Sequence, residues 1–277
     1  MSVVKCRDRI LDFTSRTLVM GILNVTPDSF SDGGDNYLVD NALEAVDSMV
    51  KSGADVIDVG GESTRPGYEQ ISDEEEIARI VPVIKRIVSN YDVAISVDTY
   101  KPNVARAALE AGAHIINDIC ALEDPDMAGV VASYNAGLIL MYNARNYPCD
   151  EDKSVSDYAA QVLSESVNKA ISAGGTKDKI ILDPGIGFGT TREQDADLIR
   201  ELSKISLEGQ YPVLLALSRK RLVAEVMGGT TTPKERDGAS LGLGLAGVNN
   251  GADMLRVHNV KLTVDALKGY DFIRGKN

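Results

Sequence analysis

The amino-acid sequence predicts an α/β fold in which eight parallel strands and the helices between them close into a (β/α)8 barrel, or TIM barrel. Short apolar runs recur along the chain and end in polar residues; they span 17–24, 54–58, 93–98, 114–117, 138–143, 180–183, 213–218 and 254–258. Runs that are apolar at nearly every position are typical of strands buried on both faces. Stretches rich in Ala and Glu separate them, and this alternation favours the barrel.

Capping signals support the intervening helices. Ser72 and Glu75 have the spacing of a capping box at the start of an amphipathic pattern. Pro102 and Pro125 occupy the position that proline favours at the start of a helix, and Gly137 is placed to end the second of these helices. Helices are expected at 72–89, 102–112, 125–137, 156–174 and 193–206, followed by a split helix at 219–227 and 235–250.

Composition indicates one soluble domain spanning residues 1–277. No apolar stretch approaches the ~20 residues that cross a bilayer, and the charged N-terminus lacks a signal sequence, so a cytoplasmic location is expected. A net charge of −12 disfavours nonspecific nucleic-acid binding, which needs a basic face. Cys6, Cys120 and Cys149 show no C-x-x-C spacing, which argues against a disulfide framework or a zinc site.

Acidic and amide side chains gather where the strands end. Asp58, Asp98 and Asp183 stand at the ends of three runs, and Asn117 ends a fourth. Each aspartate alone could cap a helix, but the C-terminal strand ends of such barrels hold the chemistry. A carboxylate can accept two parallel hydrogen bonds, so the set suits a heterocycle with adjacent N–H donors.

Cationic residues mark the last two strands. Arg256 and His258 alternate along the eighth run and therefore share a face, while the segment Ser218-Arg219-Lys220-Arg221 opens a helix at the end of the seventh run. Barrels often bind phosphate at these positions. The other histidine, His114, begins the fourth run at the opposite end and is expected to be structural.

Two long loops follow the first and second runs, at 26–34 and 60–67. Phe30, Arg65 and Pro66 supply an aromatic ring, a cation and a rigid apolar edge, which suit closure over a small substrate.

Gly242, Gly244 and Gly247 spell G-x-G-x-x-G, but they lie in an expected helix with no strand directly before them. We expect these small residues to pack a helix onto the barrel.

Seven segments, in order along the chain, closely resemble those of the dihydropteroate synthase family of pterin-binding enzymes. They are residues 24–34, 61–67, 96–99, 116–118, 183–189, 218–220 and 256–258. The resemblance implies condensation of hydroxymethyl-dihydropterin pyrophosphate with p-aminobenzoate, which gives dihydropteroate and pyrophosphate with Mg²⁺ present. It also implies a homodimer that buries the late helices and a target for sulfonamides.

The resemblance assigns roles residue by residue. The family's pterin pocket falls on Asp98, Asn117, Asp183 and Lys220, with Met141 and Phe188 as apolar walls. Its pyrophosphate site falls on Asn24, Arg256 and His258, where Asn24 also holds Mg²⁺ and Ser218 lies nearby. Thr64 and Arg65 would contact substrate, and Phe30 and Pro66 would line the p-aminobenzoate slot. Catalytic roles fall on Asp98, Asp183, Lys220, Arg256 and His258.

Three positions depart from the family pattern. Tyr142 stands where many members have His, Arg221 where many have Ser near the p-aminobenzoate carboxylate, and Thr190 where Lys is frequent. None belongs to the pterin contacts, so we expect activity to persist, and Arg221 can favour a carboxylate by its charge.

Two alternatives remain open from the sequence. A methyltetrahydrofolate-type methyltransferase has a similar pterin-binding barrel, but it does not need the long loops or the pyrophosphate site. A noncatalytic pterin-binding paralogue should have lost polar strand-end residues, which this chain keeps.

Overall fold

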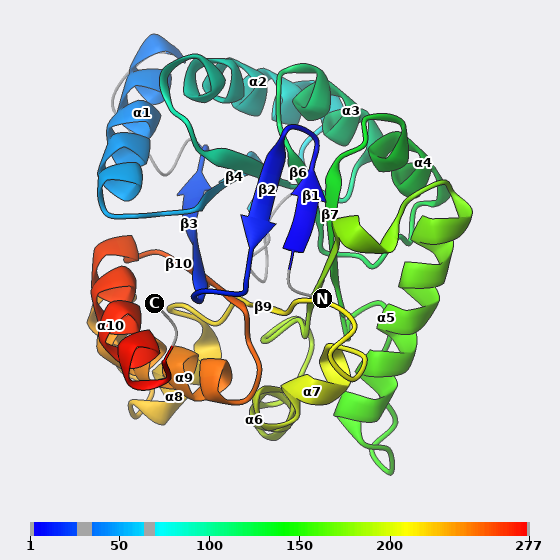
Figure 1. The fold of residues 1–277 in the computed structure, drawn as a ribbon, viewed down its shortest axis with the longest axis vertical. Coiled ribbons are helices and arrows are strands. Elements are labelled where there is room, and N and C mark those ends of the chain that lie inside the picture. The colour runs from blue at the N-terminus through cyan, green and yellow to red at the C-terminus, as the bar shows by residue number, and fades with distance from the viewer. Residues whose placement is uncertain (1–2, 27–34, 64–69, 276–277) are drawn as a thin grey trace.

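The computed structural model describes residues 3–26, 35–63 and 70–275, and it contains the expected eight parallel strands (Figure 1). The strand order is β8-β7-β6-β5-β4-β3-β10-β9, and a parallel bridge between Leu182 and Val213 links the two edges. The strands are β3 (Leu18–Asn24), β4 (Val56–Gly60), β5 (Ala94–Asp98), β6 (Ile115–Asp118), β7 (Gly137–Met141), β8 (Ile180–Asp183), β9 (Leu214–Leu215) and β10 (Met254–Val257). Every strand overlaps one predicted run, which confirms the barrel.

Helices surround the strands in Figure 1. They are α1 (Asp35–Lys51), α2 (Asp73–Asn90), α3 (Pro102–Glu110), α4 (Pro125–Ser133), α5 (Val155–Ser172), α6 (Arg192–Arg200), α7 (Leu202–Ile205), α8 (Arg221–Val226), α9 (Asp237–Asn249) and α10 (Val260–Ile273). The Ser72 side chain accepts a hydrogen bond from the Glu75 amide at 3.2 Å, as the capping spacing predicted. The expected split between α8 and α9 is present.

Two predicted helix boundaries were wrong. The helix that begins at Pro125 ends at Ser133, because Asn135 adopts a left-handed φ of 56° and turns the chain before Gly137 starts β7. The helix expected at 193–206 is divided into α6 and α7, with Glu201 between them outside helical geometry at φ −111°.

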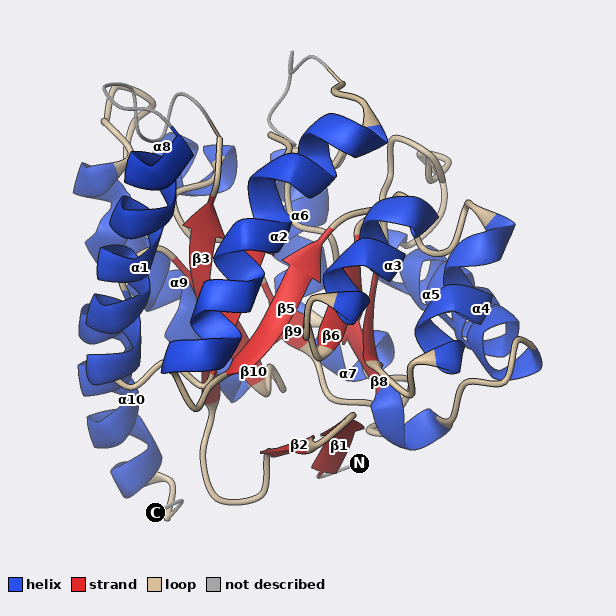
Figure 2. Ribbon diagram, turned by 90° about the horizontal axis from the view of Figure 1, so that it is seen from above, coloured by secondary structure: helices blue, strands red, loops and turns tan. Residues whose placement is uncertain are grey.

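A hairpin that the sequence analysis did not predict covers the N-terminal end of the barrel. Strands β1 (Val3–Cys6) and β2 (Arg9–Asp12) pair antiparallel, and Figure 2 shows them below the starts of the barrel strands. Their buried residues form a second core cluster with the first residues of the barrel strands; it contains Val4, Cys6, Leu11, Phe13, Leu18, Met20, Val56, Ala94, Ile115, Ile139, Ile181, Leu214 and Met254. The hairpin therefore closes the end of the barrel opposite to the polar strand ends.

His114 also lies toward the N-terminal end of the barrel. It directly precedes β6, and its Nδ1 accepts a hydrogen bond from the Ile95 amide at 3.0 Å. Burial lowers the pKa of His114, which favours the neutral ring that can accept this bond.

The glycines of α9 only partly follow expectation. A Cβ at Gly247 would lie 2.1 Å from Leu215 Cδ2, and one at Gly244 would lie 3.2 Å from Leu255 Cδ1. These two residues therefore pack α9 closely onto the barrel, whereas a Cβ at Gly242 would meet nothing within 4 Å. Across residues 3–26, 35–63 and 70–275, no helix has the length and apolar character to span a bilayer.

Candidate active site

Neighbouring strand ends form a row at the mouth of the barrel, made of Asn24, Gly60, Asp98 and Asn117. The strand register places Asn24 beside Gly60, Gly60 beside Asp98, and Asp98 beside Asn117. A Cβ at Gly60 would lie 3.7 Å from Asn24 Oδ1 and 3.8 Å from Asp98 Cβ. The absence of a side chain at Gly60 therefore leaves room between the Asn24 amide and the Asp98 carboxylate.

Arg256 on β10 reaches across the mouth to β4 and β5. Its Nε donates to Asp58 Oδ2 at 2.6 Å, and its Nη2 donates to Asp98 Oδ2 at 2.9 Å. Burial alone would lower the pKa of Arg256, but the two carboxylates raise it overall. Burial raises the pKa of Asp98 to about 7, although the charge of Arg256 opposes this shift.

Four buried polar atoms at this mouth have no hydrogen-bond partner among residues 3–26, 35–63 and 70–275. They are Asp58 Oδ1, Ser96 Oγ, Asp98 Oδ1 and Asn117 Oδ1. Three of them are carboxylate or amide oxygens. While the carboxylates are ionised, these oxygens accept hydrogen bonds but cannot donate them. Because unpartnered buried polar atoms are costly, the mouth is suited to a ligand that carries several N–H donors.

Asp183 and Lys220 form the opposite side of the mouth. Asp183 Oδ1 accepts from the Gly185 amide at 2.7 Å, and burial raises the pKa of Asp183 to about 6. Lys220 Nζ donates to the Ile186 carbonyl at 2.7 Å and lies 4.6 Å from the centroid of the Phe188 ring. Burial lowers the pKa of Lys220 to about 8, with the Asp183 charge opposing the shift. Met141, buried, lies beside Asp183 in the strand register.

Ser218 and His258 join the ends of β9 and β10. The Ser218 hydroxyl lies 3.1 Å from His258 Nδ1 and accepts from the His258 amide at 3.3 Å. Arg221 lies at the edge of this group: its side chain is 90% exposed, and its Nε donates to Glu225 Oε1 at 2.7 Å.

The structure therefore brings most of the predicted site residues to one end of the barrel. Arg256, which the resemblance assigned to the pyrophosphate site, is held in this structure by the carboxylates of Asp58 and Asp98, so the two predicted subsites are joined. The predictions for Phe30, Thr64, Arg65 and Pro66 lie outside the described residues.

Two of the three departures from the family pattern have structural partners within the described residues. Tyr142 is buried, its hydroxyl donates to the Tyr147 carbonyl at 2.9 Å, and its ring meets that of Tyr158 edge-on at 6.3 Å. Thr190 Oγ1 donates to Asp195, whose carboxylate also accepts from the Gly187 amide at 2.8 Å. Thr190 thus supports the glycine-rich turn after β8.

Sequence reasoning left two groups out of the predicted site. Asp58 was grouped with the strand-end carboxylates that suit a heterocycle, but the family resemblance gave it no role, and Ser96 was not singled out. Ser96 precedes Asp98 by two residues, so strand alternation places both on one face and could have identified Ser96. Asp58 precedes Gly60 by two residues in the same way.

Comparisons with known proteins agree with this geometry. The pterin-binding enzyme family model matches residues 20–258. The chain is 48% identical over 250 residues to dihydropteroate synthase from Streptococcus pyogenes serotype M3, covering 89% of this chain and 92% of that protein. It is 46% identical over 264 residues to dihydropteroate synthase from Staphylococcus haemolyticus, covering 94% and 96%.

Solved structures resemble the whole barrel. Xanthomonas albilineans dihydropteroate synthase with 4-aminobenzoic acid superimposes with a TM-score of 0.92 at 40% identity, covering 99% of this chain and 98% of that one. The same enzyme in complex with 7,8-dihydropteroate gives a TM-score of 0.89 at 38% identity, with 98% of each chain covered. With its polar barrel mouth and matches that span most of its length, the chain belongs to the pterin-binding enzyme family, among the transferases known as dihydropteroate synthases.

Proposed function

We propose that this barrel mouth condenses hydroxymethyl-dihydropterin pyrophosphate with p-aminobenzoate to give dihydropteroate and pyrophosphate. The observation that carries the proposal is the set of unpartnered acceptors on Asp58, Asp98 and Asn117. The aminopyrimidine edge of a pterin presents N–H donors that would satisfy such acceptors. Relatives in the family support it, since the Xanthomonas albilineans enzyme is described with 4-aminobenzoic acid and with 7,8-dihydropteroate.

The pterin would lie between the two acidic sides of the mouth. Asp183 would accept from its amino group, and Lys220 would donate to a ring oxygen or nitrogen. Lys220 already contacts the face of Phe188, so the apolar ring and the cation would lie on the same side of the ligand. Met141, buried next to Asp183 in the register, would close the apolar wall below it.

The pyrophosphate would lie over β10, where Arg256 and His258 face the mouth and Ser218 orients the imidazole. We propose that Mg²⁺ accompanies it and that Asn24 is its protein ligand. No group of three His, Cys, Asp or Glu side chains in the described ranges could hold a metal, so waters and phosphate oxygens would complete the shell. This arrangement fits the single amide oxygen beside the open Gly60 position. When bound, Mg²⁺ would supply further neutralisation of the leaving group's charge.

Cleavage would come before attack in this mechanism. The bond between the pterin methylene carbon and the pyrophosphate oxygen breaks, and its electron pair leaves with pyrophosphate. Asp98 and Asp183 would stabilise the cationic pterin, while Arg256 and His258 neutralise the leaving group. The p-aminobenzoate nitrogen then forms the new carbon–nitrogen bond and loses a proton.

The p-aminobenzoate would enter from the side of the two long loops. Phe30 and Pro66 would line its slot, and Thr64 and Arg65 would contact it. Arg221, exposed at the start of α8, would attract its carboxylate by charge.

An assay with purified protein tests the function. The protein is incubated with the pterin pyrophosphate, with and without p-aminobenzoate and Mg²⁺, and both pyrophosphate and dihydropteroate are measured. We expect both products when all components are present. A noncatalytic paralogue would bind the pterin and release neither product, and a methyltransferase would act on methyltetrahydrofolate without releasing pyrophosphate.

A pair of arginine variants tests the assignment of Arg256. Arg256→Ala should release pyrophosphate far more slowly, whereas Arg200→Ala should match the parent, because Arg200 is exposed and paired with Asp197 on α6. Pyrophosphate release by Arg256→Ala at the parental rate would contradict the role given to this residue.

The homodimer also stays a proposal. Large apolar side chains on α8, α10 and their ends are exposed in the single chain, namely Val226, Met227, Leu262, Phe272 and Ile273. A dimer that buries these helices would cover them. Light scattering at micromolar concentration should give twice the chain mass, and a monomer mass at these concentrations would contradict the proposal.

A further inference from the structure

Arg219, between Ser218 and Lys220, is held at the start of α9 through its amide, its carbonyl and two of its guanidinium nitrogens. Its guanidinium donates twice to Asp237, from Nε to Oδ1 at 2.6 Å and from Nη2 to Oδ2 at 2.9 Å. Its amide donates to Ser240 Oγ at 3.0 Å, and its carbonyl accepts from Arg236 Nη1 at 3.0 Å.

These contacts hold Arg219 in a conformation that its side chain disfavours. Its φ is 60°, in the left-handed region, which costs a residue with a Cβ about 1 kcal/mol or more. The left-handed conformation of Arg219 produces a sharp turn of the chain between Ser218 and Lys220. The left-handed conformation at Arg219, directly after Ser218, therefore depends on the bonds from α9.

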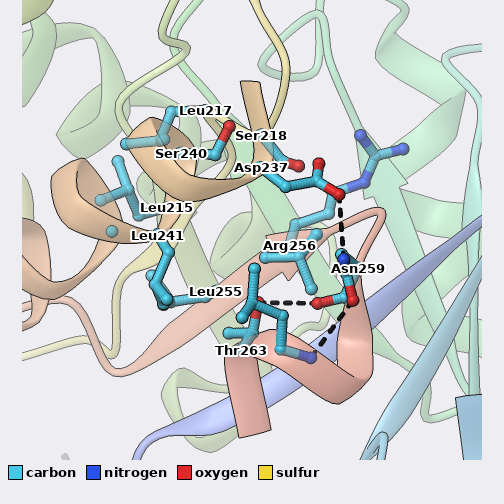
Figure 3. Close-up of a pocket in the computed structure, with 13 residues that line it drawn as sticks. Leu215, Leu217, Ser218, Asp237, Ser240, Leu241, Leu255, Arg256, Asn259 and Thr263 are labelled. Carbon is cyan, nitrogen blue, oxygen red and sulfur yellow. Dashed lines mark hydrogen bonds between the residues drawn. The ribbon is translucent and has the colours of Figure 1, made fainter. Parts of the chain in front are cut away.

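Asp237 also reaches the end of the neighbouring strand. Its Oδ2 accepts from Asn259 Nδ2 at 2.9 Å, and Figure 3 shows the two side chains joined by this bond. Asn259 directly follows His258 and caps α10 by accepting from the Leu262 amide at 3.2 Å. One carboxylate thus connects the residue after Ser218 with the residue after His258.

A small cavity and apolar side chains border this connection. A cavity lies against the cluster on the helix side, and leucines of β9, β10 and α9 line it together with Asp237, Ser240 and Asn259 (Figure 3). The directional contacts of the cluster are the bonds that Arg219 and Asn259 donate to Asp237. The Asp237 and Arg219 side chains are 16% and 20% exposed, so water screens their pair only in part.

We propose that Asp237 is a positioning residue for the pyrophosphate group of the substrate. It acts through Arg219 and Asn259, and it sets the placement of Ser218 and His258 relative to one another, whereas Lys220 keeps its own bond to the Ile186 carbonyl. The inference rests on the proposed function, because it takes pyrophosphate as the group bound over β10. Asp237 itself touches no reacting atom in this assignment.

The test compares Asp237→Asn with Asp197→Asn, which removes the same charge from an exposed pair with Arg200. Inhibition by inorganic pyrophosphate and binding of pyrophosphate-free hydroxymethyl-dihydropterin are measured for both variants and the parent. We expect the inhibition constant for pyrophosphate to rise about tenfold or more in Asp237→Asn, since small misplacements of positioned groups have effects of this size. Pterin binding should change less than about threefold, and Asp197→Asn should match the parent.

A second variant tests whether the effect could come from a general loss of structure. Asn259→Ser keeps a side chain that can cap α10 but loses the bond to Asp237, so it should weaken pyrophosphate inhibition with an unchanged melting temperature. Unchanged pyrophosphate inhibition in both variants would overturn the proposal, as would an equal loss of pterin and pyrophosphate binding. If the parent itself forms no dihydropteroate and is not inhibited by pyrophosphate, the proposed function fails instead.

Discussion

Arg256 Nε lies 2.6 Å from Asp58 Oδ2 across the mouth of the barrel, although 198 residues separate them in the chain. Asp98 shares the same guanidinium, so two carboxylates surround one arginine. The cation that should meet an anionic leaving group is therefore already partly neutralised. We therefore expect the binding of pterin and the binding of pyrophosphate to be coupled through this shared residue.

Asp58→Asn should change the affinities for pyrophosphate and for pterin in opposite directions. With one carboxylate removed, Arg256 is freer to meet phosphate, so the inhibition constant for pyrophosphate should fall by about threefold. Pterin binding should weaken about tenfold, because one carboxylate oxygen is replaced by an NH₂ group that cannot accept a hydrogen bond. Titration calorimetry with each ligand measures both, and Asp197→Asn controls for net charge. A variant in which both affinities move in the same direction would contradict the coupling.

The buried carboxylates make stability depend on pH in a defined direction. Burial raises the pKa of Asp183 from 3.8 to about 6 and that of Asp98 to about 7. Between pH 4 and these values the folded chain holds more protons than the unfolded chain, so the free energy of unfolding should fall as pH rises through this window. Lys220 has the opposite effect, because burial lowers its pKa from 10.5 to about 8. Between pH 8 and 10.5 the folded chain holds fewer protons than the unfolded chain, so the free energy of unfolding should rise with pH.

Asp183→Asn should flatten the decline between pH 4 and 6. Urea unfolding of the variant and the parent at half-unit steps of pH gives the two slopes. Asp92→Asn, an exposed carboxylate at the other end of the barrel, is the control and should keep the parental slope. Equal slopes for Asp183→Asn and the parent would show that Asp183 does not titrate as stated.

The strand ends were predictable because burial on both faces makes a strand apolar until the chain leaves the sheet. The polar residue that follows marks the mouth, as at Asp98 and Asp183. The partner of Arg256 was not predictable in this way, since strand alternation gives the face of a side chain but not the residue it reaches across the barrel.

The N-terminal hairpin and the turn after β6 were not predicted from the sequence. The hairpin strands β1 and β2 have four residues each, too few for a clear alternating pattern. After β6, Ala121 and Leu122 adopt φ values of 54° and 59° without a glycine to announce the turn. Asp118 stabilises it by accepting from the Cys120 and Leu122 amides, both at 2.8 Å, and only the folded backbone brings these groups together.

Lys101 should be important for stability. Its Nζ lies between Glu62 and Glu76, at 2.7 and 2.8 Å, and it also donates to the Ile71 carbonyl at 2.8 Å. Both carboxylates are almost fully buried, so Lys101→Met leaves them without their counterion and should cost about 3 kcal/mol of unfolding free energy. Urea unfolding measures this loss.

Lys261→Met provides the comparison for Lys101→Met, because Lys261 pairs with Asp265 on the exposed face of α10. Little change is expected there, since exposed pairs contribute little. A loss in Lys101→Met no larger than that in Lys261→Met would show that the buried cluster does not depend on its lysine.

Gly185 should not tolerate a side chain. Its φ is 73°, and a Cβ there would lie 1.7 Å from the Tyr142 carbonyl oxygen, which is backbone and cannot move aside. Gly185→Ala should therefore weaken the turn that places the Gly185 amide on Asp183, and pterin binding should fall with stability.

Gly209→Ala measures the free-energy cost of the left-handed backbone alone, without a steric contact like that of Gly185 with Tyr142. Gly209 has a similar φ of 79°, but a Cβ there would meet nothing within 4 Å, so this variant should lose only about 1 kcal/mol and keep its pterin affinity. Gly185→Ala should lose at least about 2 kcal/mol more, because the chain must shift to relieve the contact with Tyr142. Urea unfolding and pterin titration are made on both proteins. If the two variants lost equal stability, the close approach of the β8 turn to Tyr142 would not be what requires glycine at this position.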